Sequence, residues 1–113
     1  MDYKKYLGDW INTLQQDPAI TRFKLFEEQG AVMIEAETAG PIKNLGKAPT
    51  QMFVLASDPE KVTAFEVRYD TDATEYHMCI NDSKGLLVAA TFQHVKDGSN
   101  RKPIFSREFF YKD

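Results

Sequence analysis

Ile104-Phe105-Ser106-Arg107-Glu108-Phe109-Phe110-Tyr111 is the stretch with the clearest two-residue period in this chain. Successive side chains of a β-strand point to opposite faces, so such a period separates two faces. One face would carry Phe105, Arg107, Phe109 and Tyr111, and the other Ile104, Ser106, Glu108 and Phe110. We expect the first set to point into the core. The stretch therefore predicts a strand with one inward and one outward face.

Turn signals divide the rest of the chain at intervals of about ten residues, which is typical of an all-β sandwich or barrel. The runs between these signals predict eight strands: Gly8–Thr13, Ile20–Glu28, Ala31–Thr38, Gln51–Ala56, Val62–Tyr69, Thr74–Asn81, Leu86–Val95 and Ile104–Tyr111. Residues 1–7 predict one short helical turn. Alternation sends His77 outward and predicts an inward set of Phe65, Val67, Tyr69, Tyr76, Met78 and Ile80, with Leu86, Val88, Ala90, Phe92 and His94 on the following strand.

Eight strands without a covering helix leave two exposed sheet edges unless the sheet closes on itself, and open edges favour aggregation. We therefore expect a closed eight-stranded antiparallel up-and-down barrel. A chain of 113 residues is long enough for one core and too short for two, so residues 1–113 are expected to form a single domain. At eight strands the interior of a barrel is either filled by side chains or holds one small ligand.

Charge and composition exclude several partners. The net charge is −3, with 42% hydrophobic and 27% charged residues, so no excess of basic residues is available to neutralise nucleic acid. No apolar run has the length of a membrane span or a secretion signal, which predicts no membrane insertion and a cytoplasmic location. Cys79 is the one cysteine, so an internal disulfide is excluded.

Several short motifs carry a family resemblance. Gly8-Asp9-Trp10 opens the first strand and Arg107 lies in the last one, together with the segments Trp10–Thr13, Asp17-Pro18, Thr21–Phe23, Thr91–Arg101 and Ser106–Tyr111. This arrangement resembles a group of small uncharacterised bacterial lipocalin-like proteins of the calycin superfamily. The resemblance implies that Arg107 stacks across Trp10 and plugs one end of the barrel; a cation–π contact would stabilise such a pair. The alternative is that Trp10 is a core aromatic and Arg107 an outward charge.

Loop lengths predict which end of the barrel is open. Three of the four connections opposite the start of the first strand are long, at residues 14–19, 39–50 and 96–103, whereas the fourth, Asp70–Ala73, is short. Long loops suit the entrance of a pocket. Aromatic side chains with a few polar groups are the usual lining of a small-molecule site. We therefore predict a pocket for a small apolar or amphipathic, possibly anionic, molecule lined by Tyr69, Tyr76, Phe92, His94 and Phe105.

Two other functions stay open at this stage. In the first, the barrel is an isomerase or cyclase with His94 as acid or base, because imidazole titrates near neutral pH. In the second, the barrel is filled and acts through its outer surface, where Ile104 and Phe110 would support a homodimer. No nucleotide-binding, zinc-type or nucleophile motif is present in the sequence, so we predict no metal, no cofactor and no assigned catalytic residue.

Overall fold

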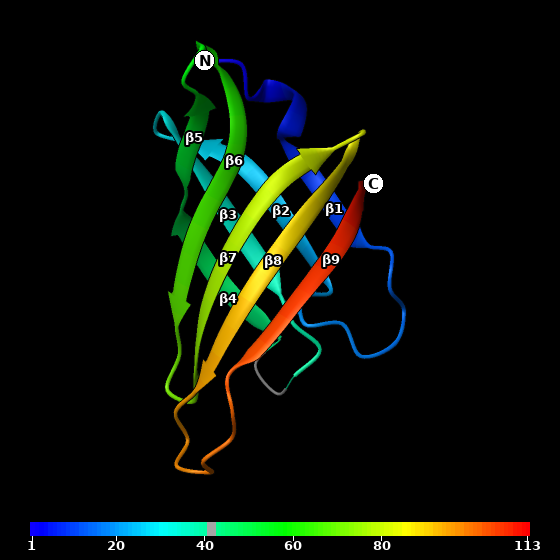
Figure 1. Cartoon of the computed structure of the whole chain (residues 1–113), viewed down its shortest axis with the longest axis vertical. Helices are drawn as coiled ribbons and strands as arrows, with labels where there is room; N and C mark the ends of the chain where they lie inside the picture. The colour runs from blue at the N-terminus through cyan, green and yellow to red at the C-terminus, as the bar shows by residue number, and fades with distance from the viewer. Residues whose placement is uncertain (41–42) are drawn as a thin grey trace.

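The computed structural model describes residues 1–40 and 43–113 and shows an all-β chain with one 3₁₀ turn at its start (Figure 1). The elements are η1 (Lys4–Tyr6), β1 (Gly8–Asn12), β2 (Arg22–Glu28), β3 (Ala31–Glu37), β4 (Asn44–Pro49), β5 (Gln51–Leu55), β6 (Asp58–Asp70), β7 (Thr74–Ser83), β8 (Leu86–Val95) and β9 (Ile104–Lys112). Both the all-β class and the short N-terminal turn are confirmed.

The strands form one antiparallel sheet in the order β4-β3-β2-β1-β9-β8-β7-β6-β5. Strands that follow one another in the chain pair, except β4 and β5, and β1 pairs with β9 to join the first and last strands. This is the predicted up-and-down topology, and the sheet curls into a nearly closed barrel (Figure 1). No helix among the described residues is both long and apolar enough to span a bilayer.

The predicted closed barrel of eight strands is corrected: the described residues form nine strands, and the barrel is nearly closed, with a seam between β4 and β5. Residues 44–49 were expected to lie in the 39–50 connection, yet they form β4 and pair with β3. After Thr50 the chain continues as β5, which pairs with β6 at the other end of the sheet order. Thr50, between β4 and β5, is fixed against β3 because its amide (3.0 Å) and its hydroxyl (2.8 Å) both donate hydrogen bonds to the Val32 carbonyl.

The predicted inward faces are confirmed for β6 and β7 and are wrong for β8 and β9. Met78 on β7 is fully buried, and the register places Met78 opposite Thr91 and Thr91 opposite Ser106. The inner face of β8 and β9 therefore carries Leu87, Ala89, Thr91, Ser106, Glu108 and Phe110. Phe105 and Tyr111, which were expected inside, are 58% and 45% exposed. Aromatic residues on both faces of β9 made its alternation uninformative about direction.

Side chains fill the barrel. Fully buried residues from around the sheet meet in one cluster, the largest being Phe23, Phe65, Phe110, Ile20, Leu25, Ile34, Met78 and Ile80. The rings of Phe23 and Phe110 lie 4.7 Å apart between centroids, which joins β2 to β9. The alternative of a filled barrel therefore describes this interior better than a hollow container does.

Both ends of the barrel carry buried side chains. At the η1 end, Tyr6 lies against Phe65 in a T-shaped contact (5.7 Å between centroids) and donates a hydrogen bond to Asp82 (3.0 Å). At the other end, Ile20 in the loop between β1 and β2 is fully buried. Glu108 holds that loop by accepting hydrogen bonds from the amides of Ala19 (3.0 Å) and Ile20 (3.3 Å).

Candidate functional site

The clearest pocket lies at the loop end of the barrel, between the β3–β4 loop and the β6–β7 hairpin. Its volume is about 190 Å³, and it is lined by Thr38, Gly40, Leu45, Thr71, Ala73, Thr74 and Tyr76. Of the three long connections, the one at residues 39–50 contributes Gly40 and Leu45 to this pocket, and the short connection between β6 and β7 contributes Thr71 and Ala73. Residues 41 and 42 of the predicted 39–50 loop lie outside the described residues.

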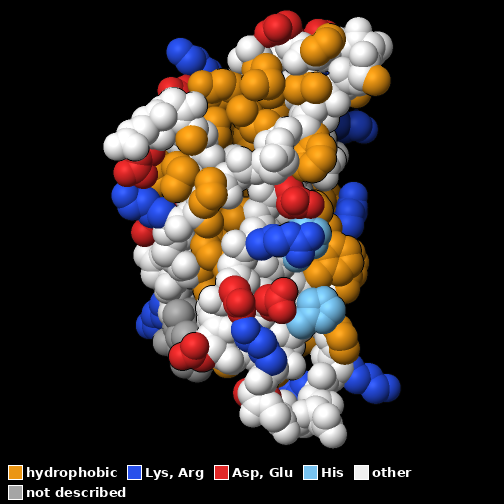
Figure 2. Space-filling view, turned by 90° about the vertical axis from the view of Figure 1, so that its left-hand side faces the viewer, with side chains coloured by type: hydrophobic (Ala, Val, Ile, Leu, Met, Phe, Trp, Pro, Cys, Tyr) orange, Lys and Arg blue, Asp and Glu red, His pale blue; other side chains and the backbone are white. Residues whose placement is uncertain are grey.

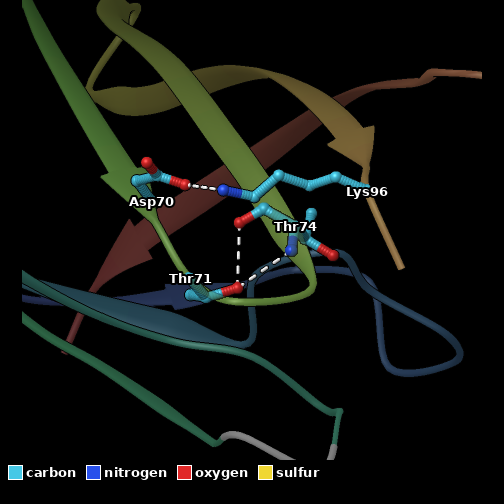
Figure 3. Close-up of polar contacts among 4 residues, drawn as sticks. All are labelled: Asp70, Thr71, Thr74 and Lys96. Carbon is cyan, nitrogen blue, oxygen red and sulfur yellow. Dashed lines mark hydrogen bonds and ion pairs between the residues drawn. The ribbon is translucent and has the colours of Figure 1, made fainter. Parts of the chain in front are cut away.

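The β6–β7 hairpin contributes Thr71, Ala73 and Thr74 to the lining of this pocket, and Figure 3 draws the polar contacts at its turn. The Thr71 hydroxyl accepts a hydrogen bond from the Thr74 amide (3.0 Å) and donates one to the Thr74 carbonyl (2.9 Å). Outside this turn, Lys96 forms an ion pair with Asp70, and the Lys96 amide donates to the Ala73 carbonyl (2.8 Å). The hairpin is therefore held to the end of β8, and the Thr71 hydroxyl is used within the turn.

The opposite wall comes from the β3–β4 loop and the first residues of β4. The Thr38 hydroxyl accepts a hydrogen bond from the Gly40 amide (3.2 Å), and Leu45 adds an apolar side chain that packs against the core. Tyr76 closes the inner side of the pocket from β7 and also packs against the core. Burial raises the pKa of Tyr76, so its hydroxyl stays neutral at physiological pH.

Tyr69 and Tyr76 are the two predicted lining residues that point inward. Tyr69 is buried, and its hydroxyl lies 3.2 Å from the Ile34 carbonyl and 3.0 Å from the Gly46 carbonyl. These contacts tie β6 to β3 and β4 across the seam, which is a structural role. Burial raises the pKa of Tyr69 to about 12. Tyr76 is thus the one predicted residue that borders the pocket.

Phe92, His94 and Phe105 lie on the outer face of the barrel, so their predicted place inside a pocket is wrong. His94 is exposed, and Phe92 is 41% exposed. The rings of Phe92 and Phe105 contact each other with centroids 5.1 Å apart. The cause is that β8 and β9 turn the opposite face inward from the one predicted. A shift of one residue in the alternation moves every side chain of a strand to the other face, so these three residues point outward.

The predicted stacking of Arg107 on Trp10 is also wrong. Trp10 is 3% exposed, and its indole Nε1 donates to the Tyr6 carbonyl at 2.9 Å. Arg107 is on the outer face, with its guanidinium over the Phe109 ring at 5.0 Å. The end of the barrel beside Trp10 is closed by Tyr6 of η1 instead.

A cluster on the outer face of β6 and β7, formed by Glu66, His77 and Cys79, was not predicted from the sequence. Burial and the charge of Glu66 raise the pKa of the Cys79 thiol above its ordinary value. The available signal was the spacing His77-x-Cys79, because residues two apart in a strand share a face. Glu66 joins them only through the pairing of β6 with β7.

No family model, no curated protein and no solved structure matches this chain. The candidate sites therefore rest on the geometry of the chain itself.

Proposed function

We propose that this protein binds a small apolar molecule, about the size of one aromatic ring, in the pocket between the β3–β4 loop and the β6–β7 hairpin. The observation that carries the proposal is the pocket itself, with about 190 Å³ bordered by Leu45, Ala73 and Tyr76. An apolar cavity of about 150 Å³ is known to accept benzene, whereas drug-sized ligands need about 300–1,000 Å³. This pocket is too small for a lipid or another large ligand.

The polar groups at this pocket favour an uncharged ligand. The hydroxyls of Thr38 and Thr71 take part in local turns, and the charges of Asp70 and Lys96 neutralise each other at the hairpin. A ligand would therefore gain mainly from burial of apolar surface, at about 25 cal/mol per Å². The anionic ligand considered from the sequence has no basic side chain among the residues that line the pocket.

The proposal includes the resemblance to lipocalin-like proteins that the sequence motifs carry. The nearly closed up-and-down barrel is compatible with such a fold. In this chain, however, buried side chains fill the centre of the barrel, so the proposed ligand lies at the loop end. The isomerase or cyclase alternative is not proposed, because its acid–base residue, His94, is exposed on the outer face and does not line the pocket.

Binding can be tested by titrating ¹⁵N-labelled protein with benzene, phenol, indole and decanoate while recording amide chemical shifts. We expect the neutral ring compounds to shift amides of Thr38, Leu45, Ala73 and Tyr76, and decanoate to bind more weakly. Shifts confined to other residues, or none at near-saturating ligand, would overturn the proposal.

A pair of matched variants sharpens the test. Leu45→Trp places a large side chain in the pocket and should abolish the shifts, because it occupies the volume that the ligand needs. Leu14→Trp adds the same ring at a position that is 50% exposed and does not line the pocket, so it should bind like the parent chain. Equal binding by both variants would show that the ligand sits elsewhere.

A second candidate function is self-association through the outer face of β8 and β9. Phe92 and Phe105 are 41% and 58% exposed, are directly paired and have ring centroids 5.1 Å apart, so they form an apolar patch on this face. Ile104, which was expected to contribute, is 42% exposed but alternates to the other face of β9. Phe110, which was expected to contribute, is fully buried. Light scattering tests this: a dimer that becomes monomeric in Phe92→Ser/Phe105→Ser supports it, and a monomeric parent chain rejects it.

A further inference from the structure

The outer face of β6 and β7 brings together three side chains that bind metals. The antiparallel register places Glu66 directly opposite Cys79, and His77 lies two residues before Cys79 on the same face. Neighbouring strands hold all three residues, so their backbone positions are set by the ladder of hydrogen bonds. Side chains on strands are positioned more precisely than side chains on loops.

The donor atoms are already close to one another. His77 Nε2 lies 2.9 Å from Glu66 Oε2, and Cys79 Sγ lies 3.8 Å from His77 Nε2. All three potential ligand atoms lie within 4.8 Å of one another. Around a tetrahedral zinc ion, ligand atoms lie about 3.4–3.6 Å apart, given its usual bond lengths. Small rotations of the side chains would therefore suffice to surround an ion.

We propose that Glu66, His77 and Cys79 form a Zn²⁺ site on the outer face of the barrel. Imidazole nitrogen, thiolate sulfur and carboxylate oxygen are all zinc ligands, whereas Ca²⁺ and Mg²⁺ require oxygen ligands. Three protein ligands leave the fourth tetrahedral position to water or to an external ligand, as in open zinc sites. This site is separate from the loop-end pocket and does not depend on it.

The surroundings of the cluster support a defined site. The side chains of His77 and Glu66 are 24% and 30% exposed, so the donors are partly shielded yet open to an ion from solvent. The Phe92 ring lies beside the His77 ring, 5.9 Å away and tilted by 31°. Figure 2 shows one face of the molecule, on which histidine side chains lie among basic, acidic and apolar groups.

Arg68 is the nearby charge that opposes the ion. It lies opposite His77 in the register and is exposed. Its positive charge favours the thiolate form of Cys79 but repels a cation, and solvent screens both effects at an exposed position. Removal of this charge in Arg68→Gln should therefore change zinc affinity less than removal of a ligand does.

Zinc binding can be tested on full-length protein dialysed against EDTA, by calorimetry with Zn²⁺ and by optical spectra with Co²⁺. We expect one ion per chain and a thiolate-to-cobalt charge-transfer band. Outer-shell partners alone are worth about 10–100-fold in metal affinity, so Cys79→Ser, His77→Ala and Glu66→Gln should each weaken zinc binding at least tenfold. The charge-transfer band should vanish in Cys79→Ser and persist in Glu66→Gln.

His94→Ala is the matched control, because it removes the other histidine of the chain from the same outer face. It should bind zinc like the parent chain. Far-UV circular dichroism checks that each variant is folded; if Cys79→Ser does not fold, His77→Ala decides the comparison with His94→Ala. The proposal is overturned if the parent chain binds no zinc, if the cobalt spectrum lacks the thiolate band, or if His77→Ala and His94→Ala lose the same affinity.

Discussion

At the scale of single residues, Glu108 shows how a buried charge organises a loop. Its carboxylate is 7% exposed on the inner wall of β9 and accepts hydrogen bonds from the amides of Ala19 and Ile20. The side chain of Ile20 then fills the loop end of the barrel. Hydrophobic patterning alone would place a glutamate on the outer face. The hydrogen bonds to the loop explain why Glu108 points inward from β9.

We predict that Glu108→Ala destabilises the protein by about 2–4 kcal/mol, since the buried Ile20 amide loses its acceptor at about 1–3 kcal/mol and the part-buried Ala19 amide loses a hydrogen bond worth about 1 kcal/mol. Urea unfolding measures the loss. Glu75→Ala, at an exposed position on β7, is the control and should stay within about 0.5 kcal/mol of the parent chain. Equal losses in the two variants would contradict the anchoring role of Glu108.

At the scale of elements, the break at Thr50 decides how the sheet curls. β4 and β5 are consecutive in the chain but pair with β3 and β6, at opposite ends of the sheet order. β4 also lies beside β6, and the hydroxyl of Tyr69 crosses from β6 to the Gly46 carbonyl on β4. One bent segment thus brings the two ends of the sheet together.

We predict that Thr50→Val loosens this segment. The change keeps the branched shape and removes one hydrogen bond to the Val32 carbonyl, which should cost about 0.5–1.5 kcal/mol. Hydrogen exchange should accelerate at amides of β4 and β5 and stay unchanged in β8. Thr63→Val is the control. It removes a longer hydrogen bond (3.3 Å) from the Thr63 hydroxyl to the carbonyl of Phe53, a residue whose side chain is exposed. Faster exchange spread evenly over all strands would argue against a local effect.

At the scale of the whole molecule, two tyrosines couple the closure of the barrel to pH. Tyr6 lies at the η1 end and Tyr69 spans the seam. Burial is the main cause that raises the pKa of each to about 12 from an ordinary value of 10.0, and Asp82 adds to the shift of Tyr6. The folded state therefore holds these protons to higher pH than the unfolded chain does.

The stability that these two tyrosines contribute is therefore fully present below pH 10 and is lost as the pH rises from 10 towards 12. We predict that the free energy of unfolding, measured by urea titration at pH 8–12, falls less steeply in Tyr6→Phe/Tyr69→Phe than in the parent chain. Tyr111→Phe, at a side chain that is 45% exposed, should follow the parent curve. A double variant that also follows the parent curve would refute this account.

Local pattern was enough for part of this molecule. The all-β class, the up-and-down order, the N-terminal turn and the inward faces of β6 and β7 follow from turn spacing and alternation, which depend on residues near one another in the chain. Along β6 and β7, apolar side chains alternate with more polar ones, so only one face of each strand suits a core. That face includes Phe65, Val67, Met78 and Ile80.

Only the tertiary structure decided the rest. The faces of β8 and β9 depend on which partner residues they pair with, because both faces of β9 carry aromatic side chains. β4 forms from a Gly- and Pro-containing segment because β3 offers it a free edge. The set of residues that line the loop-end pocket depends on the same strand pairing, as does the proximity of Glu66 to His77 and Cys79. Strand pairing joins residues far apart in the chain, and a two-residue period carries no record of such partners.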